Sequence, residues 1–227
     1  MRHGGCTGVE ALLRWQHPTR GMIPPNTFIP ATEQTTMIHE VTERVVTMGL
    51  ERLVRWGLEG RELTMSVNLS VRDLADRTIA ERIGNIVRFY GSRLTHLEFE
   101  VTETAIMENP RLAADNIARL KALGASVAID DFGSGHSSLA YLADLPCDTL
   151  KIDRAFVASI KDGSRDQSIV RAAIALAHEL GMTVVAEGVE DADTVDALRA
   201  WDCDAAQGYF FGRPTLDPSL DFDVSVR

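Results

Sequence analysis

Segments with strand-like and helix-like hydrophobic patterns alternate along the whole chain. Short runs of alternating apolar and polar residues predict β-strands, and longer segments with apolar residues three or four positions apart predict helices. The predicted strands are 9–15, 64–70, 96–102, 126–130, 149–153, 183–187 and 205–209. The predicted helices are 27–57, 79–89, 109–123, 137–142, 165–180 and 192–201. This regular alternation predicts parallel strands connected by helices.

The predicted strands carry one apolar and one polar set of alternating residues. The apolar set is Val67, Leu69, Phe99, Val101, Ile129, Leu150, Ile152, Val184 and Ala186. The polar set is Ser66, Asn68, Glu98, Glu100, Asp130, Thr149, Lys151, Asp153 and Glu187. An open sheet covered by helices on both faces would be apolar in both sets. The pattern therefore predicts an α/β fold of the (β/α)₈ barrel type, with the polar set facing inward.

The length of the chain sets the expected domain organisation. A chain of 227 residues suits one domain with a large core. We expect a single domain over 1–227, with a leader at 1–8 and the barrel over about 9–215. The seven predicted strands are one fewer than a closed barrel contains, so we expect a part of such a barrel to be missing at the N-terminus.

The amino-acid composition limits the classes of binding partner and the cellular compartment that we expect for this protein. A net charge of −10 argues against a surface for DNA or RNA and against a polybasic membrane patch. Three widely spaced cysteines, Cys6, Cys147 and Cys203, are typical of a reducing compartment. No apolar run approaches the roughly 20 residues of a membrane span, and no signal peptide precedes the domain. We therefore expect a cytoplasmic protein without membrane contact.

Two adjacent acids, Asp130 and Asp131, are the first candidates for chemistry. Successive strand residues point to opposite faces, so both can serve one site only if the strand ends there and the chain turns at Gly133 and Gly135. Two ionised carboxylates this close repel each other, and a divalent cation between them would relieve the repulsion. An Asx-type turn leading into a helix N-cap explains the same residues equally well.

Further polar residues stand near the ends of other predicted strands. They are Glu10, Asn68, Glu100, Lys151 and Glu187. With Asp130 and Asp131 they form an oxygen-only ligand set, which favours Mg²⁺, Mn²⁺ or Ca²⁺ over Zn²⁺ or Cu²⁺. So many carboxylates suit two metals that share Asp130, and such a site activates water for attack at phosphorus. Taken singly, Glu98 also fits a polar layer inside the barrel, and Glu190 fits an acid at a helix N-terminus.

A series of motifs follows in order along nearly the whole chain. They are Glu10-Ala-Leu-Leu-Arg-Trp15, Asn68-Leu-Ser70, Glu100-Val-Thr-Glu103, Asp130-Asp-Phe-Gly133, Lys151-Ile-Asp153, Glu187-Gly-Val-Glu190 and Gln207-Gly-Tyr209. The series resembles the EAL domain family of bacterial cyclic di-GMP phosphodiesterases. The resemblance implies a (β/α)₈-type fold, in agreement with the strand pattern.

The resemblance also implies a role for individual residues. The positions that match metal ligands are Glu10, Asn68, Glu100, Asp130 and Asp131, with Asp130 shared by both ions. The positions that match groups around the attacking and metal-bound water are Lys151, Glu187, Glu190 and Gln207. Arg14 matches an arginine that reaches a substrate phosphate, and Glu103 matches a glutamate that braces the loop 132–138. In the family that loop takes part in dimerisation.

The chain departs from the family pattern in two places. His136 and Ser134 stand in the loop where the family usually has tyrosine and threonine, and we interpret both as tolerated substitutions. His136 adds a ring that titrates near neutral pH. The second difference is that this chain starts too late to contain the initial helix and strand that precede the position of Glu10 in the family. This difference raises a question of stability rather than of chemistry.

The implied function is hydrolysis of one phosphodiester of cyclic di-GMP to linear pGpG with two Mg²⁺ or Mn²⁺ ions per active site. A homodimer is implied, as are sensory or diguanylate cyclase (GGDEF) domains outside this chain. The alternative is a catalytically impaired receptor for cyclic di-GMP, or an interaction module, on the same fold. A Schiff-base aldolase that uses Lys151 is a third hypothesis, and the surrounding acids argue against it.

Overall fold

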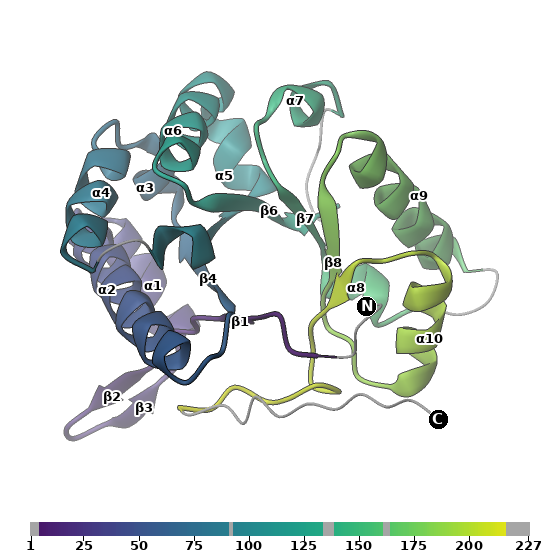
Figure 1. Cartoon of the computed structure of the whole chain (residues 1–227), viewed down its shortest axis with the longest axis horizontal. Helices are drawn as coiled ribbons and strands as arrows, with labels where there is room; N and C mark the ends of the chain where they lie inside the picture. The colour runs from purple at the N-terminus through teal and green to yellow at the C-terminus, as the bar shows by residue number, and fades with distance from the viewer. Residues whose placement is uncertain (1–4, 91–92, 134–138, 161–163, 217–227) are drawn as a thin grey trace. The chain divides into compact units, whose positions relative to one another are not determined.

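The computed structural model describes residues 5–90, 93–133, 139–160 and 164–216, and the loop residues 134–138, His136 among them, lie outside this part (Figure 1). The chain forms two compact units. We call Thr7–Ser126 the N-terminal unit, and Val127–Arg227 with Met1–Cys6 the C-terminal unit. No helix in the described residues is both long enough and apolar enough to cross a membrane.

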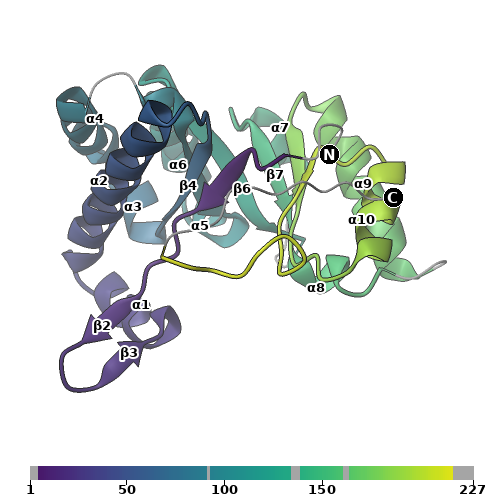
Figure 2. The same cartoon turned by 60° about the horizontal axis from the view of Figure 1, so that its bottom comes forward.

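Three parallel strands form the centre of the N-terminal unit. They are β1 (Gly8–Glu10), β4 (Thr64–Leu69) and β5 (Leu97–Thr102), in the order β1-β4-β5. The helices are α1 (Pro25–Glu33), α2 (Met37–Leu58), α3 (Val71–Ala75), α4 (Ile79–Tyr90), α5 (Glu103–Glu108) and α6 (Pro110–Ala122), with a 3₁₀ turn at Arg93–His96. A short antiparallel hairpin, β2 (Trp15–His17) and β3 (Gly21–Ile23), extends beside α1 (Figure 2).

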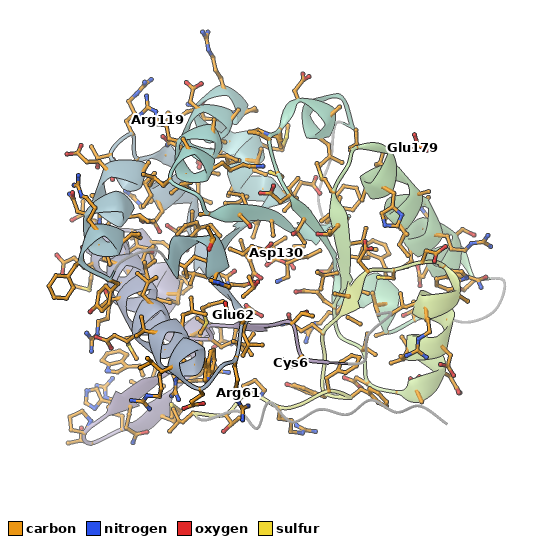
Figure 3. All side chains as sticks on the ribbon, viewed as in Figure 1. Cys6, Arg61, Glu62, Arg119, Asp130 and Glu179 are labelled. Atoms are coloured by element: carbon orange, nitrogen blue, oxygen red, sulfur yellow. The ribbon has the colours of Figure 1, made fainter. Side chains whose placement is uncertain are left out.

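Four parallel strands form the centre of the C-terminal unit. They are β6 (Ser126–Phe132), β7 (Thr149–Ile152), β8 (Thr183–Ala186) and β9 (Ala205–Ala206), in that order. The helices are α7 (Leu139–Asp144), α8 (Arg154–Val157), α9 (Arg165–Glu179) and α10 (Ala192–Ala200). Helix α9 packs against β7 and β8, and Glu179 marks its end in Figure 3. The parallel strands of both units correspond one to one to the seven predicted segments.

The apolar strand set forms the core, as predicted. Val67, Phe99, Val101, Leu150 and Val184 are fully buried, and no other member of the set is more than 4% exposed. Burying a side chain of this size contributes about 1.5–3 kcal/mol. The alternation of strand residues therefore fixes which set is buried in the core and leaves the opposite, polar set for the site.

Two predicted elements near the N-terminus are wrong. The segment 9–15 is not one strand, because β1 ends at Glu10 and Trp15 instead pairs with Ile23 in the hairpin. The predicted helix 27–57 is two helices, α1 and α2. At the break the Thr35 hydroxyl donates to the Thr32 carbonyl and accepts from the amide of Met37. Such local bonds from a threonine side chain compete with the helical hydrogen bonds.

Three short helices that follow strands were not predicted, because the polar residue that caps each helix was interpreted as the end of the preceding strand. Ser70 caps α3, Thr102 caps α5 and Asp153 caps α8, each by accepting a hydrogen bond from a backbone amide of the first turn. A polar residue that follows an apolar strand is therefore compatible with both a strand end and a helix N-cap. The last strand also ends earlier than predicted, at Ala206.

Candidate active site

An acidic cluster lies at the ends of β6 and β8 in the C-terminal unit. One oxygen from each of Asp130, Asp131 and Glu187 falls within 4.8 Å of the other two. Asp130 is 9% exposed and is labelled on β6 in Figure 3. The three groups offer only carboxylate oxygens, the ligand type that Mg²⁺ and Mn²⁺ prefer. The cluster therefore fits a hard divalent cation.

The backbone of β6 brings both aspartates into this cluster by a route that differs from the prediction. The strand does not end at Asp130 but continues to Phe132. Asp131 itself adopts a positive φ of 54°, and the register with β7 shifts between Ile129 and Phe132. An irregular residue of this kind interrupts the strict alternation of faces. Both residues thus lie inside a strand, which argues against the alternative of a helix N-cap.

Lys151 on β7 is the cation of the cluster. Its side chain is 3% exposed, and its Nζ atom lies 2.6 Å from Glu187 Oε1 and 3.5 Å from Asp130 Oδ1. The amide of Glu187 donates to the Ile152 carbonyl, so the residue after β8 is anchored to β7. A buried lysine between two carboxylates offsets their mutual repulsion. An amine held in such ion pairs is a poor nucleophile, which argues against the aldolase hypothesis.

Asp131 has a strongly raised carboxyl pKa. Burial, the neighbouring charge of Asp130 and a hydrogen bond to Asp153 raise the pKa of Asp131 to about 6, and Lys151 opposes the shift. Asp153 is itself fixed as the N-cap of α8, where it accepts from the amide of Ala155. Metal binding would require the ionised form of Asp131, so it would release protons below about pH 6.

We predict that the metal-free protein loses stability as the pH rises from about 4 to about 7 because of Asp131. Its pKa is about 6 in the folded state and about 3.9 when unfolded, so the folded state holds the proton more tightly. The stabilisation is complete below the unfolded pKa and is lost as the pH passes the folded one. Urea unfolding of wild type and Asp131→Asn in EDTA would measure it. A difference between the two proteins that does not change with pH would contradict the prediction.

Two glycines hold the segment from Glu187 to Glu190 in place. Gly188 has φ of 72°, and a Cβ there would lie 2.4 Å from Arg154 Cβ. A Cβ on Gly208 would lie 2.2 Å from the carbonyl oxygen of Val189. The amide of Val189 donates to the Gln207 carbonyl, and the amide of Gln207 donates to the Ala186 carbonyl. Backbone packing thus fixes Gln207, which is half-buried, and Glu190, which is exposed.

The N-terminal unit carries a second group of predicted site residues. Asn68 on β4 donates from Nδ2 to Glu10 Oε1 at 2.8 Å, and it is the register partner of Glu100 on β5. Glu100 is 1% exposed. Glu98 accepts a hydrogen bond from Ser66 on the neighbouring strand, as expected for the polar-layer interpretation of this residue. Neighbouring parallel strands therefore bring Glu10, Asn68 and Glu100 together.

Of the two remaining predicted residues of this unit, Arg14 lies directly before β2 and Glu103 directly after β5. Arg14 is exposed after β1, and its guanidinium donates to the Leu13 carbonyl at 2.9 Å. Glu103 is the first residue of α5 and is 6% exposed. Its predicted contact with the loop 132–138 involves residues outside the described ranges. Sequence reasoning assigned no site role to Asp153, although its spacing before Ala155 is that of an N-cap and its carboxyl group reaches Asp131.

The sequence model of the EAL domain family matches residues 1–214. The chain belongs to the EAL domain family. Cyclic di-GMP phosphodiesterase PA2567 of Pseudomonas aeruginosa is 36% identical over 96% of this chain and 37% of its own length. Cyclic di-GMP phosphodiesterase PdeR of Escherichia coli is 37% identical over 97% of this chain and 33% of its own length. This EAL domain thus spans about a third of the length of these curated relatives.

A solved structure shares the fold. The structure of the PaMucR phosphodiesterase in complex with c-di-GMP has a TM-score of 0.85 and 38% identity, over 92% of this chain and 85% of that one. This match, with the helix-connected parallel strands of both units, confirms the predicted TIM-like α/β class.

Proposed function

We propose that this EAL domain hydrolyses one phosphodiester bond of cyclic di-GMP to linear pGpG with the help of two Mg²⁺ or Mn²⁺ ions. The observation that carries the proposal is the oxygen cluster of Asp130, Asp131 and Glu187 with the buried Lys151 beside it. The relatives named as cyclic di-GMP phosphodiesterases and the PaMucR complex with c-di-GMP support the choice of substrate.

The proposed metal ligands are carboxylate and amide oxygens in both units. In the N-terminal unit they are Glu10, Asn68 and Glu100, and in the C-terminal unit they are Asp130 and Asp131. Bound ions would lower the pKa of a water molecule and polarise the phosphoryl oxygens. The hydrogen bond from Asn68 to Glu10 orients that carboxylate before any ion arrives. Such preorganisation lowers the cost of forming a charged transition state.

Lys151 is the proposed group that orients the attacking water. Its Nζ donates to oxygen acceptors, and its ion pair with Glu187 at 2.6 Å keeps it at one position. Glu187, Glu190 and Gln207 are proposed to accept from or donate to the water molecules of the site. Arg14, exposed after β1, is proposed to bind a substrate phosphate through its guanidinium. Glu103 is proposed to brace the loop 132–138.

The proposal extends to the organisation of the chain. We propose that 1–227 acts as one EAL domain, with its barrel over about 9–215, in the cytoplasm and as a homodimer. The proposed partners outside the chain are sensory or GGDEF domains, since the relatives are about three times as long.

Turnover of cyclic di-GMP by the purified chain, with Mn²⁺ or Mg²⁺ and with EDTA, tests the proposed function. We expect pGpG to form with either metal, to stop on addition of EDTA and to resume when excess metal is restored. Nucleotide binding without pGpG under metal-replete conditions would overturn the proposal in favour of the receptor hypothesis. Turnover that EDTA does not affect would overturn the metal mechanism alone.

A further inference from the structure

A completely buried carboxylate lies on α3, the short helix that follows β4 in the N-terminal unit. Asp73 on α3 is 0% exposed. Four donors surround it, namely His39 Nδ1 at 2.7 Å, Thr42 Oγ1 at 2.7 Å, Ser70 Oγ at 2.7 Å and the Ser70 amide at 3.2 Å. A buried carboxylate is costly unless several donors satisfy it, and these four do so. None of the motifs that carry the family resemblance contains Asp73, His39 or Thr42.

The direction of each hydrogen bond follows from the chemistry of the acceptor. An ionised carboxylate only accepts, so the imidazole Nδ1 of His39 and the hydroxyl of Thr42 must both donate. His39 and Thr42 are three residues apart on α2 and therefore lie on the same face of that helix. They stand 34 and 31 positions before Asp73 in the sequence. Asp73 therefore ties the first turns of α2 to the first turn of α3.

The other half of the cluster controls the exit of β4. Ser70 is the N-cap of α3, and its hydroxyl also accepts from the amide of Asp73 in a reciprocal capping box. Only Leu69 separates Ser70 from Asn68, the residue that holds Glu10. A capping box alone satisfies a helix end at the surface. Here His39 and Thr42 of α2 also donate to the Asp73 carboxylate, which in turn accepts from Ser70. The position of Ser70 is therefore fixed by α2 as well as by α3.

We propose that Asp73, with His39 and Thr42, is a positioning group that sets the end of β4 and thereby the metal-binding geometry of Asn68. The inference rests on the proposed function in so far as Asn68 is a metal ligand. Asp73 acts through Ser70 and the backbone and touches no substrate. Groups that orient metal ligands typically change metal affinity by about 10- to 100-fold when they are removed.

The test measures Mn²⁺ binding by calorimetry in the absence of nucleotide, together with the thermal unfolding midpoint. Thr42→Val removes the hydroxyl donor at nearly constant volume, whereas Thr42→Ser keeps the donor. We expect Thr42→Val to weaken Mn²⁺ binding about tenfold, the low end of this range, and Thr42→Ser to bind like wild type. Thr78→Val is the matched control, because it also removes a hydroxyl bond to an aspartate, Asp76, but beyond the other end of α3.

A double-mutant cycle shows whether Thr42 acts through Asn68. In an Asn68→Ala background, we expect Thr42→Val to have no further effect on Mn²⁺ affinity. If Thr42→Val lowers the unfolding midpoint but leaves Mn²⁺ affinity and turnover unchanged, the cluster is merely structural and the inference is overturned. Equal effects of Thr42→Val in both backgrounds would overturn it as well. Wild-type protein that binds Mn²⁺ without turnover would overturn the proposed function and leave this inference standing.

Discussion

Asp130→Asn is expected to abolish hydrolysis of cyclic di-GMP while the protein remains folded. The substitution replaces a carboxylate oxygen of the Asp130, Asp131 and Glu187 cluster with an amide and removes one negative charge. Several kcal/mol of transition-state stabilisation depend on the bound ions, so the rate should fall on the order of 1000-fold. The measurement is pGpG formation at saturating Mn²⁺, with Mn²⁺ affinity determined in parallel. Both quantities should fall.

The control for this prediction is Glu98→Gln, which removes the charge of another strand carboxylate by the same chemical change. Glu98 accepts from Ser66 Oγ at 3.1 Å, and glutamine retains an oxygen that can accept this bond. Turnover of Glu98→Gln should therefore stay within a small factor of wild type. Wild-type turnover by Asp130→Asn in metal-replete buffer would contradict the role assigned to Asp130. Equal losses in both variants would show that rate follows total charge and not one ligand.

The alternating pattern of the strands predicted the fold correctly, because burial selects apolar residues at every second position of a strand. Val67, Phe99 and Leu150 had to be buried in the core, and their polar neighbours had to point to the opposite face of the sheet. The helix boundaries were harder, since they depend on single hydrogen bonds. The break at Thr35 and the caps at Ser70 and Asp153 each rest on one side chain bonding to a nearby backbone group. Hydrophobic periodicity contains no information about such bonds.

For the candidate site, the sequence predicts which residues lie close together within each unit, but not their backbone conformations or their long-range contacts. Strand ends in register bring Asn68 beside Glu100, because parallel neighbours end at the same edge. The positive φ of Asp131 was not predictable, since glycine is the residue that normally takes this conformation. The cluster at Asp73 was missed because two of its donors, His39 and Thr42, come from a helix more than thirty residues earlier. Contacts of that range follow from packing rather than from local pattern.

Lys151→Met is expected to lower kcat and at the same time to strengthen Mn²⁺ binding. Lys151 competes with the metal, because its ammonium group neutralises Asp130 and Glu187. Without the lysine the carboxylates repel each other. The free energy of unfolding of the metal-free protein should therefore fall by about 3–5 kcal/mol, the usual cost of breaking a buried ion pair. Bound Mn²⁺ should restore much of this stability. The catalytic rate should fall at least about 100-fold, because the group that orients the water is lost.

Three measurements on Lys151→Met and on the control Lys121→Met, a lysine of α6, separate these contributions. Urea unfolding with EDTA and with Mn²⁺ gives the linked stability, calorimetry gives Mn²⁺ affinity, and steady-state kinetics separate kcat from KM. A change confined to KM would mean that Lys151 only binds a substrate phosphate. Weaker Mn²⁺ binding would mean that the lysine supports the metal site and does not compete with it. Asp130→Asn and Lys151→Met should thus shift metal affinity in opposite directions although both lower the rate of turnover, because one removes a ligand and the other removes a competing cation.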